Sequence, residues 1–315
     1  MSKLALSLYD HYDICVIKGD EISTTTNSSD KLFDVASLTK AIVHILICRL
    51  YARGEINIQH RISSYIKDIA NSGERTVLDF LRFTVQSYGF DYPQLKIKPY
   101  RTGGDIEDLF IYSGFQTHLR EHRYDNVATV FLGILLKKIT GINNLQGAIN
   151  YLIDDKGLNI VFHPDPKLTV NNQFVHDPFA CNQRNFQIAT AGIFSRADIL
   201  AKIFYQQFEY LLNRSFYSQI SSNTLEGVDN RHSWAMGFDI PYPDNPVYCF
   251  VEKPLVFAGY TGCRIFFGIE KTKSKPIVIC ILTDRVYKND SPQSRRDFSK
   301  WFWEYVISVL NEQVE

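Results

Sequence analysis

The chain has 315 residues, of which 45% are hydrophobic and 22% charged. That composition fits one large globular domain or two modest ones and excludes a disordered, collagen-like or coiled-coil chain. Lys plus Arg and Asp plus Glu both number 34, so the formal net charge is zero and gives no electrostatic footprint for nucleic acid. The longest apolar run is too short to span a membrane, and the first residues lack the apolar region of a secretory signal. We therefore expect a cytoplasmic protein with no nucleic-acid and no membrane partner.

The six cysteines are scattered along the chain. No pair has C-x-x-C spacing, and no histidine pair completes a zinc pattern. Most lie in apolar surroundings, as Cys48 and Cys280 do. We predict buried, reduced thiols that act as small hydrophobic residues, and neither a metal site nor an organic cofactor.

Hydrophobic periodicity predicts strands near both ends of the chain and helices in the middle. Residues 24–30 are polar and are predicted to form a loop. The predicted strands span residues 13–18, 247–251, 263–269 and 276–283, and the predicted helices span residues 38–53, 77–84, 127–139, 198–212 and 295–310.

This order predicts an α/β (α+β) fold in which strands from both chain ends form one central antiparallel sheet flanked by helices. Residues 1–56 and 227–315 would form the sheet domain, and residues 57–226 a large, mostly helical inserted domain. The helix that starts at residue 38 is apolar almost all round, which is typical of a buried central helix. We expect it at the seam between the two parts, with the active site there.

The first element that carries chemistry is Ser37-Leu-Thr-Lys40, an S-x-x-K motif. Residues three apart at the start of a helix share one face, so the hydroxyl and the amine can meet. The Ser37 Oγ would lie in the positive field of the helix N-terminus, and the unpaired Ser37 N–H could donate to an oxyanion. Burial against an apolar helix favours the neutral amine of Lys40, which is then a workable general base.

The motif alone is weakly specific, because the chain contains a second one, Ser64-Tyr-Ile-Lys67. That copy lies in a polar segment with no long apolar helix after it. We interpret it as a solvated surface, so context rather than pattern selects Ser37.

The second element is Tyr124-Asp-Asn126, directly before the apolar helix predicted at residues 127–139. A phenol can relay a proton, and an amide can hold a substrate carbonyl. A similar triplet, Tyr287-Lys-Asn289, precedes a polar loop and receives little weight. The third element is the stretch 256–267, in which Gly259 and Gly262 bracket Tyr260 and Thr261 at the start of a strand. Glycine there would permit a close approach to the sheet edge.

In this order the three elements resemble the serine β-lactamase and penicillin-binding-protein superfamily, most of all its class C and esterase-like branch. The flanking segments add to the resemblance, which covers roughly residues 12–310: they are residues 32–41, 50–58, 122–133, 138–141, 175–180, 191–198 and 282–287. The family uses S-x-x-K, Y-x-N and a (K/H)-T-G triad. The resemblance implies that Ser37 is the acylated nucleophile, Lys40 its base, Tyr124 the proton shuttle and Asn126 a substrate contact.

The third motif departs from the family pattern, and two alignments remain open. We favour the one that places the triad on Phe257-Ala258-Gly259, with the N–H of Tyr260 as oxyanion donor, so that Phe257, Gly259 and Tyr260 are the predicted substrate-binding residues of this motif. The other places it on Tyr260-Thr261-Gly262, with Cys263 as donor. In both, the cationic or imidazole group that often binds a substrate carboxylate in the family is missing. Backbone oxyanion donors do not depend on that side chain.

These observations predict a serine hydrolase that acts through an acyl-enzyme on a small-molecule ester, amide or peptide substrate, of esterase-like type and without a cofactor. A D-alanyl peptidase or β-lactamase that recognises penicillins is one alternative. A binding protein that keeps the fold with little catalysis is another. The sequence makes no prediction about the oligomeric state.

Overall fold

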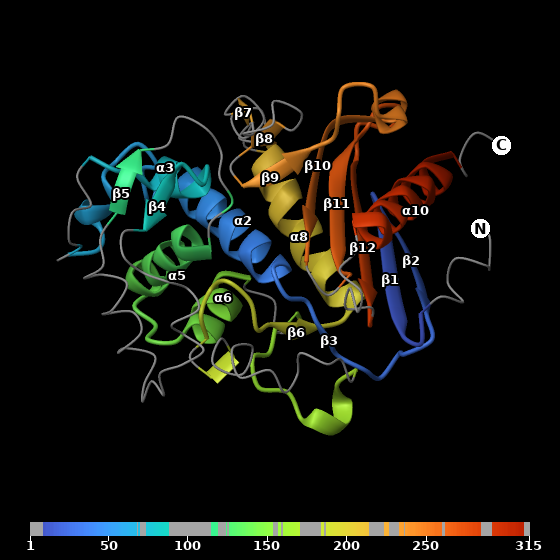
Figure 1. The fold of residues 1–315 in the computed structure, drawn as a ribbon, viewed down its shortest axis with the longest axis horizontal. Helices are drawn as coiled ribbons and strands as arrows, with labels where there is room; N and C mark the ends of the chain where they lie inside the picture. The colour runs from blue at the N-terminus through green and yellow to red at the C-terminus, as the bar shows by residue number, and fades with distance from the viewer. Residues whose placement is uncertain are drawn as a thin grey trace.

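The computed structural model describes most of the chain (Figure 1). The described residues are 9–67, 69, 74–87, 115–118, 124, 126–153, 157–158, 160–170, 184–185, 187–213, 224–226, 233–235, 237–259, 262–284 and 292–311.

An antiparallel sheet forms the centre of the protein, with strand order β2-β1-β12-β11-β10-β9-β8-β7. Its N-terminal strand β1 pairs along its whole length with β12 near the C-terminus, with Cys15 opposite Cys280. The predicted sheet built from both chain ends is therefore confirmed. Its strands are β1 (Tyr12–Lys18), β2 (Glu21–Thr26), β7 (Thr224–Glu226), β8 (Ser233–Ala235), β9 (Phe238–Ile240), β10 (Val251–Ala258), β11 (Arg264–Glu270) and β12 (Pro276–Thr283).

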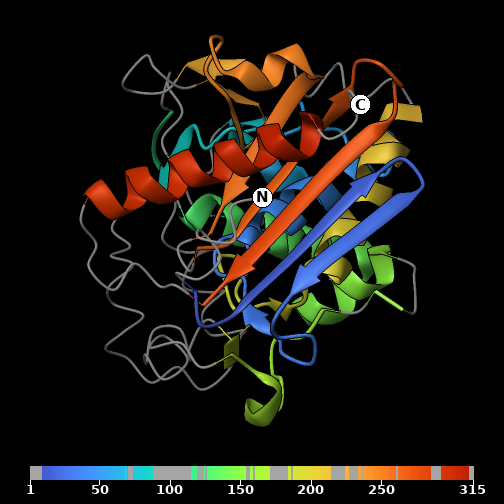
Figure 2. The ribbon, with the colours of Figure 1, turned by 90° about the vertical axis from the view of Figure 1, so that its right-hand side faces the viewer.

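Helices cover both faces of this sheet. Helix α10 (Pro292–Asn311) crosses one face, while α8 (Ala197–Asn213) and α2 (Leu38–Ala52) lie on the other (Figures 1 and 2). Strand β12 is buried at every position. Its alternate side chains serve two cores: Ile279 packs in the cluster with α10, and Cys280 in the cluster with α2 and α8. The continuous apolar run of this strand follows from burial on both faces.

The remaining elements lie on the α2 side (Figure 1). Helix α2 is buried over nearly its full length, as its apolar circumference predicts. Just beyond its end, Gly54 has φ +74 and closes the last turn by donating to the Tyr51 carbonyl. The other elements are α3 (Val77–Leu81), α5 (Asn126–Thr140), α6 (Leu145–Ile153), the paired strands β3 (Phe33–Asp34) and β6 (Phe194–Ser195), and the pair β4 (Val85–Ser87) and β5 (Phe115–His118).

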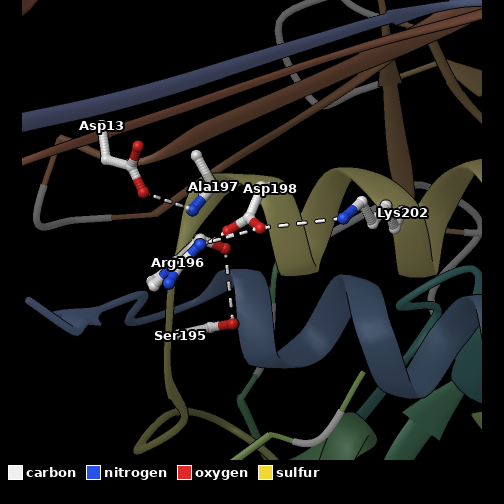
Figure 3. Close-up of polar contacts among 6 residues, drawn as sticks. All are labelled: Asp13, Ser195, Arg196, Ala197, Asp198 and Lys202. Carbon is white, nitrogen blue, oxygen red and sulfur yellow. Dashed lines mark hydrogen bonds and ion pairs between the residues drawn. The ribbon is translucent and has the colours of Figure 1, made fainter. Parts of the chain in front are cut away.

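A buried carboxylate ties α8 to the sheet. Asp13 on β1 accepts a hydrogen bond from the N–H of Ala197 at 2.8 Å, where α8 begins (Figure 3). Burial raises the pKa of Asp13, and this N–H opposes the rise. Asp198 also pairs with Arg196 through both its oxygens at 2.9 Å, and with Lys202 at 3.8 Å. Because β6 runs directly into α8, this cluster also fixes the strand that lies beside the candidate site.

Two predictions about local structure are wrong. Residues 24–26, predicted to be loop, belong to β2, an edge strand whose side chains are almost all exposed. Its threonines favour strand, and an exposed edge tolerates polar residues on both faces. The predicted strand 247–251 is mostly a 3₁₀ turn, Pro246–Cys249, capped by the Asn245 side chain. Proline after an N-cap asparagine starts a helical turn and overrides the strand preference of the valines.

The turn between β11 and β12 yields a stability prediction. Ser274 is exposed and has φ +52, a left-handed conformation that disfavours side chains with a Cβ. Replacing Ser274 with glycine should therefore raise the free energy of unfolding by about 0.5 kcal/mol, after the added entropy of the unfolded glycine is subtracted. Urea denaturation measures the change. Ser274→Ala keeps the Cβ and should give no gain, and a lower midpoint for the glycine variant would contradict the argument.

Among the described helices, none combines the length and hydrophobicity that a membrane crossing requires. The division of the chain into a sheet domain and an inserted helical domain remains a prediction.

Candidate active site

Ser37 stands at the N-terminal end of α2, just after a strained turn. Ala36 has φ +45, and its N–H donates to a carboxylate oxygen of Asp34 at 2.9 Å. Ser37 itself has helical angles, φ −66 and ψ −8, and its hydroxyl does not cap the helix. The hydroxyl is therefore available to other partners, and its oxygen lies at the positive end of a buried helix.

The Asp34 carboxylate is fully buried behind this turn. Burial raises its pKa, while the hydrogen bond from Ala36 and the charge of Arg184 act in the opposite direction. A short carboxylate that bonds to the N–H two residues later stabilises a tight turn. Asp34 thus shapes the backbone that presents Ser37.

Lys40 lies one turn along α2 and is 1% exposed. Its Nζ is 2.9 Å from Ser37 Oγ and donates to the Thr190 carbonyl at 2.7 Å. Thr190 reaches this position because β6 pairs with β3, and because the Val35 N–H donates to Ile193 at 3.1 Å. The Thr190 carbonyl accepts one N–H of the Lys40 amine and so fixes the nitrogen where it can also contact the Ser37 hydroxyl.

Tyr124 is the second side chain that contacts the Ser37 hydroxyl. Its Oη donates to Ser37 Oγ at 2.9 Å, and Lys40 Nζ lies 5.1 Å from the centre of its ring. The side chain is 44% exposed. The structure therefore brings together the three residues that the sequence singled out, with the hydroxyl of Ser37 between an amine and a phenol.

The other predicted residues occupy different surroundings. Asn126 is half-buried and is the first residue of α5. Phe257 on β10 is 4% exposed, and its ring packs edge-on against Phe238 at 6.1 Å. A Cβ on Gly259 would lie 2.7 Å from the Val35 carbonyl, so only glycine lets the end of β10 come this close to the turn before Ser37. Tyr260 lies outside the described residues.

The second S-x-x-K motif is not assembled in the same way. Ser64 and Lys67 of the second S-x-x-K are both exposed; Ser64 ends a 3₁₀ turn at residues 62–64, and Lys67 lies three residues beyond it. Residues 287–289 lie outside the described part of the chain. Within that part, no group of three His, Cys, Asp or Glu side chains could hold a metal ion.

Three contributors were missed by the sequence reasoning: Asp34, the Thr190 carbonyl and Phe83. Asp34 could have been noticed as a turn-forming residue two positions before Ala36. A backbone carbonyl 150 residues from Lys40 carries no sequence signal. Phe83, whose ring is 5.5 Å from that of Tyr124, looks like any core phenylalanine in the sequence.

Comparison with known proteins identifies the family of this chain. The Beta-lactamase family matches residues 13–300, and the chain belongs to this family. No curated protein matches the chain.

Solved structures with the same fold have low sequence identity to this chain. D-amino acid amidase from Ochrobactrum anthropi SV3 is 13% identical and has a TM-score of 0.71, with 98% of this chain and 96% of that one covered. EstCE1, described as a hydrolase with promiscuous acyltransferase activity, is 13% identical, with a TM-score of 0.70 and 96% of both chains covered. A class C β-lactamase from Rhodobacter sphaeroides is 13% identical, with a TM-score of 0.63 and 97% of both chains covered.

Proposed function

We propose that this protein is a serine hydrolase that acts through an acyl-enzyme formed on Ser37. One observation carries the proposal: Lys40 Nζ and Tyr124 Oη both lie 2.9 Å from Ser37 Oγ. That distance suits proton transfer, and a nucleophile activated by an adjacent base is the requirement for this chemistry. Membership of a family whose structural neighbours include esterases, amidases and β-lactamases supports it.

The proton steps follow from the contacts. Ser37 gives its proton to the amine of Lys40 while Oγ forms a bond to the carbonyl carbon. The oxyanion is held by the Ser37 N–H and, in the alignment we favour, by the N–H of Tyr260. When the bond to the leaving group breaks, the leaving atom takes the Tyr124 proton, and the proton on Lys40 restores the phenol. Water then attacks the acyl group, and Ser37 regains its proton.

The substrate we propose is a neutral ester or amide of a small molecule, with Asn126 as a contact. In the alignment we favour, Phe257 takes the place where the family often has a cation, and it is uncharged and packed against Phe238. A substrate carboxylate placed there would lose its hydration without gaining an ion pair, which is costly. Esters without a free carboxylate are therefore favoured over penicillins and D-alanyl peptides.

Covalent labelling tests the proposal. A fluorophosphonate should add one adduct mass to the native chain and none to Ser37→Ala, as read by intact-protein mass spectrometry. Ser64→Ala is the matched control and should label like the native protein, because Ser64 is exposed and belongs to the unassembled motif. An adduct on Ser37→Ala would refute the assignment of the nucleophile. Trapping by a fluorescent penicillin would favour the penicillin-recognising alternative instead.

A further inference from the structure

Helix α3 ends in a way that is unusual for this chain. Its last turn closes through two hydrogen bonds, from the N–H of Phe83 to the carbonyl of Phe80 at 3.2 Å and from the N–H of Thr84 to that of Asp79 at 3.0 Å. Helix α2 ends in the same pattern, with Gly54 at the equivalent position. That position requires a left-handed backbone, which glycine adopts at little cost. In α3 it is held by phenylalanine, with φ +53.

The contacts of the Phe83 ring explain why phenylalanine, rather than glycine, occupies this position. Phe83 is fully buried, and its ring lies 5.0 Å from that of His44 in a stacked arrangement and 5.5 Å from that of Tyr124. The same turn built with glycine would leave the inner face of the Tyr124 ring without this neighbour. The strained backbone at Phe83 is therefore tolerated because it places an aromatic ring against Tyr124.

The other side of Phe83 is held by a fixed group. His44 lies one turn beyond Lys40 on α2 and is completely buried. Its Nε2 is 3.4 Å from the hydroxyl of Thr129 on α5. A Cβ on Gly237 would come within 2.2 Å of its Nδ1, so the chain before β9 presses directly on the imidazole. Phe83 thus lies between an immobile ring and the Tyr124 ring, which is 44% exposed.

We propose that Phe83 is a positioning residue that holds the phenol of Tyr124 on Ser37. The inference rests on the proposed function, since it assigns to Phe83 the task of orienting the proton donor. Tyr124 stands just before α5 and is 44% exposed, so its ring needs a rigid inner surface to keep Oη at 2.9 Å from Ser37 Oγ. Small displacements of a reacting group cost large factors in rate.

A double-mutant cycle with Tyr124→Phe tests the proposal on turnover of a small p-nitrophenyl ester. Phe83→Leu should lower kcat by about 10- to 100-fold and change KM little, because the ring positions a proton donor rather than the substrate. Tyr124→Phe should lower kcat by about 100-fold or more. The double variant should be no slower than Tyr124→Phe alone, since Phe83 acts only through the phenol. A purely structural role would give multiplicative losses instead.

Two further variants keep the test decisive. Phe80→Leu, in the same helix, removes a buried ring that packs on Phe131 at 5.5 Å, and its kcat should stay within about twofold of native. Phe83→Gly takes the left-handed turn without strain and should show the same loss of kcat as Phe83→Leu.

Three results would overturn the inference: a native kcat in either folded Phe83 variant, an undiminished effect of Phe83→Leu in the Tyr124→Phe background, or failure of both Phe83 variants to fold. A result of this kind, with labelling still dependent on Ser37, would leave the proposed hydrolase intact. Labelling that survives Ser37→Ala would remove the hydrolase assignment itself.

Discussion

Replacing Ser37 with alanine should lower kcat/KM for a small activated ester by about 10⁴- to 10⁶-fold, the loss typical of removing a catalytic nucleophile. The variant keeps the buried helix and the turn shaped by Asp34, because the Ser37 hydroxyl does not cap α2. It removes only the oxygen on which Lys40 and Tyr124 converge. Initial rates with a p-nitrophenyl ester measure the effect, and a thermal melt confirms that the variant is folded.

Ser64→Ala provides the matched comparison. It changes the same residue type in the same sequence pattern at an exposed position, and it should leave kcat/KM unchanged. Residual turnover in Ser37→Ala within about tenfold of native would mean that another group carries the reaction. Tight binding of an ester by both native protein and Ser37→Ala, with no product burst in either, would instead identify a binding protein that keeps the fold.

The sequence predicted those site residues whose position follows from the local helix pattern. The apolar run immediately after Ser37 predicted the position of α2. The spacing of Ser37 and Lys40 predicted their contact, because residues three apart on a helix share a face. Tyr124 was identified by its place before α5. The contact between Tyr124 and Ser37 spans 87 residues, and its prediction depended on the family resemblance rather than on any local pattern.

The sequence was uninformative where tertiary contacts override local preference. The carbonyl of Thr190 and the ring of Phe83 acquire their roles only after β6 pairs with β3 and α3 packs beside α5. Phe257 looked like a substrate contact from its place in the third motif. In the structure its ring lies in the core against Phe238, since alternate residues of β10 face the buried side of the sheet.

Backbone strain marks the candidate site independently of the motifs. Among the described residues, five that are not glycine have positive φ. Two of them adjoin the site, since Ala36 precedes Ser37 and Phe83 contacts Tyr124; a third, Gln187, lies three residues before Thr190 in the sequence. Such conformations persist only where the surrounding structure over-determines them, and they gather at functional sites. The turn that presents Ser37 and the ring that contacts Tyr124 therefore both depend on a residue held in a strained conformation.

Replacing Lys40 with methionine should lower kcat by about 10³- to 10⁴-fold, because it removes the general base while keeping a long, unbranched side chain in a site that is 1% exposed. Lys40→Arg should be equally slow, because a guanidinium is always positively charged and therefore cannot accept a proton as a base. Steady-state rates with an activated ester compare the two. If the amine served only as a positive charge for the oxyanion, arginine would restore much of the activity and methionine would not.

Lys67→Met is the control, at the same position of the exposed second motif, and it should match the native rate. Combining Lys40→Met with Ser37→Ala should cost scarcely more than Ser37→Ala alone, because an amine that acts only by taking the serine proton has no task once the hydroxyl is gone. Multiplicative losses would assign Lys40 a separate role in binding substrate. Near-native turnover in Lys40→Met would contradict the mechanism at its first step, since no other described side chain except Tyr124 is hydrogen-bonded to Ser37 Oγ.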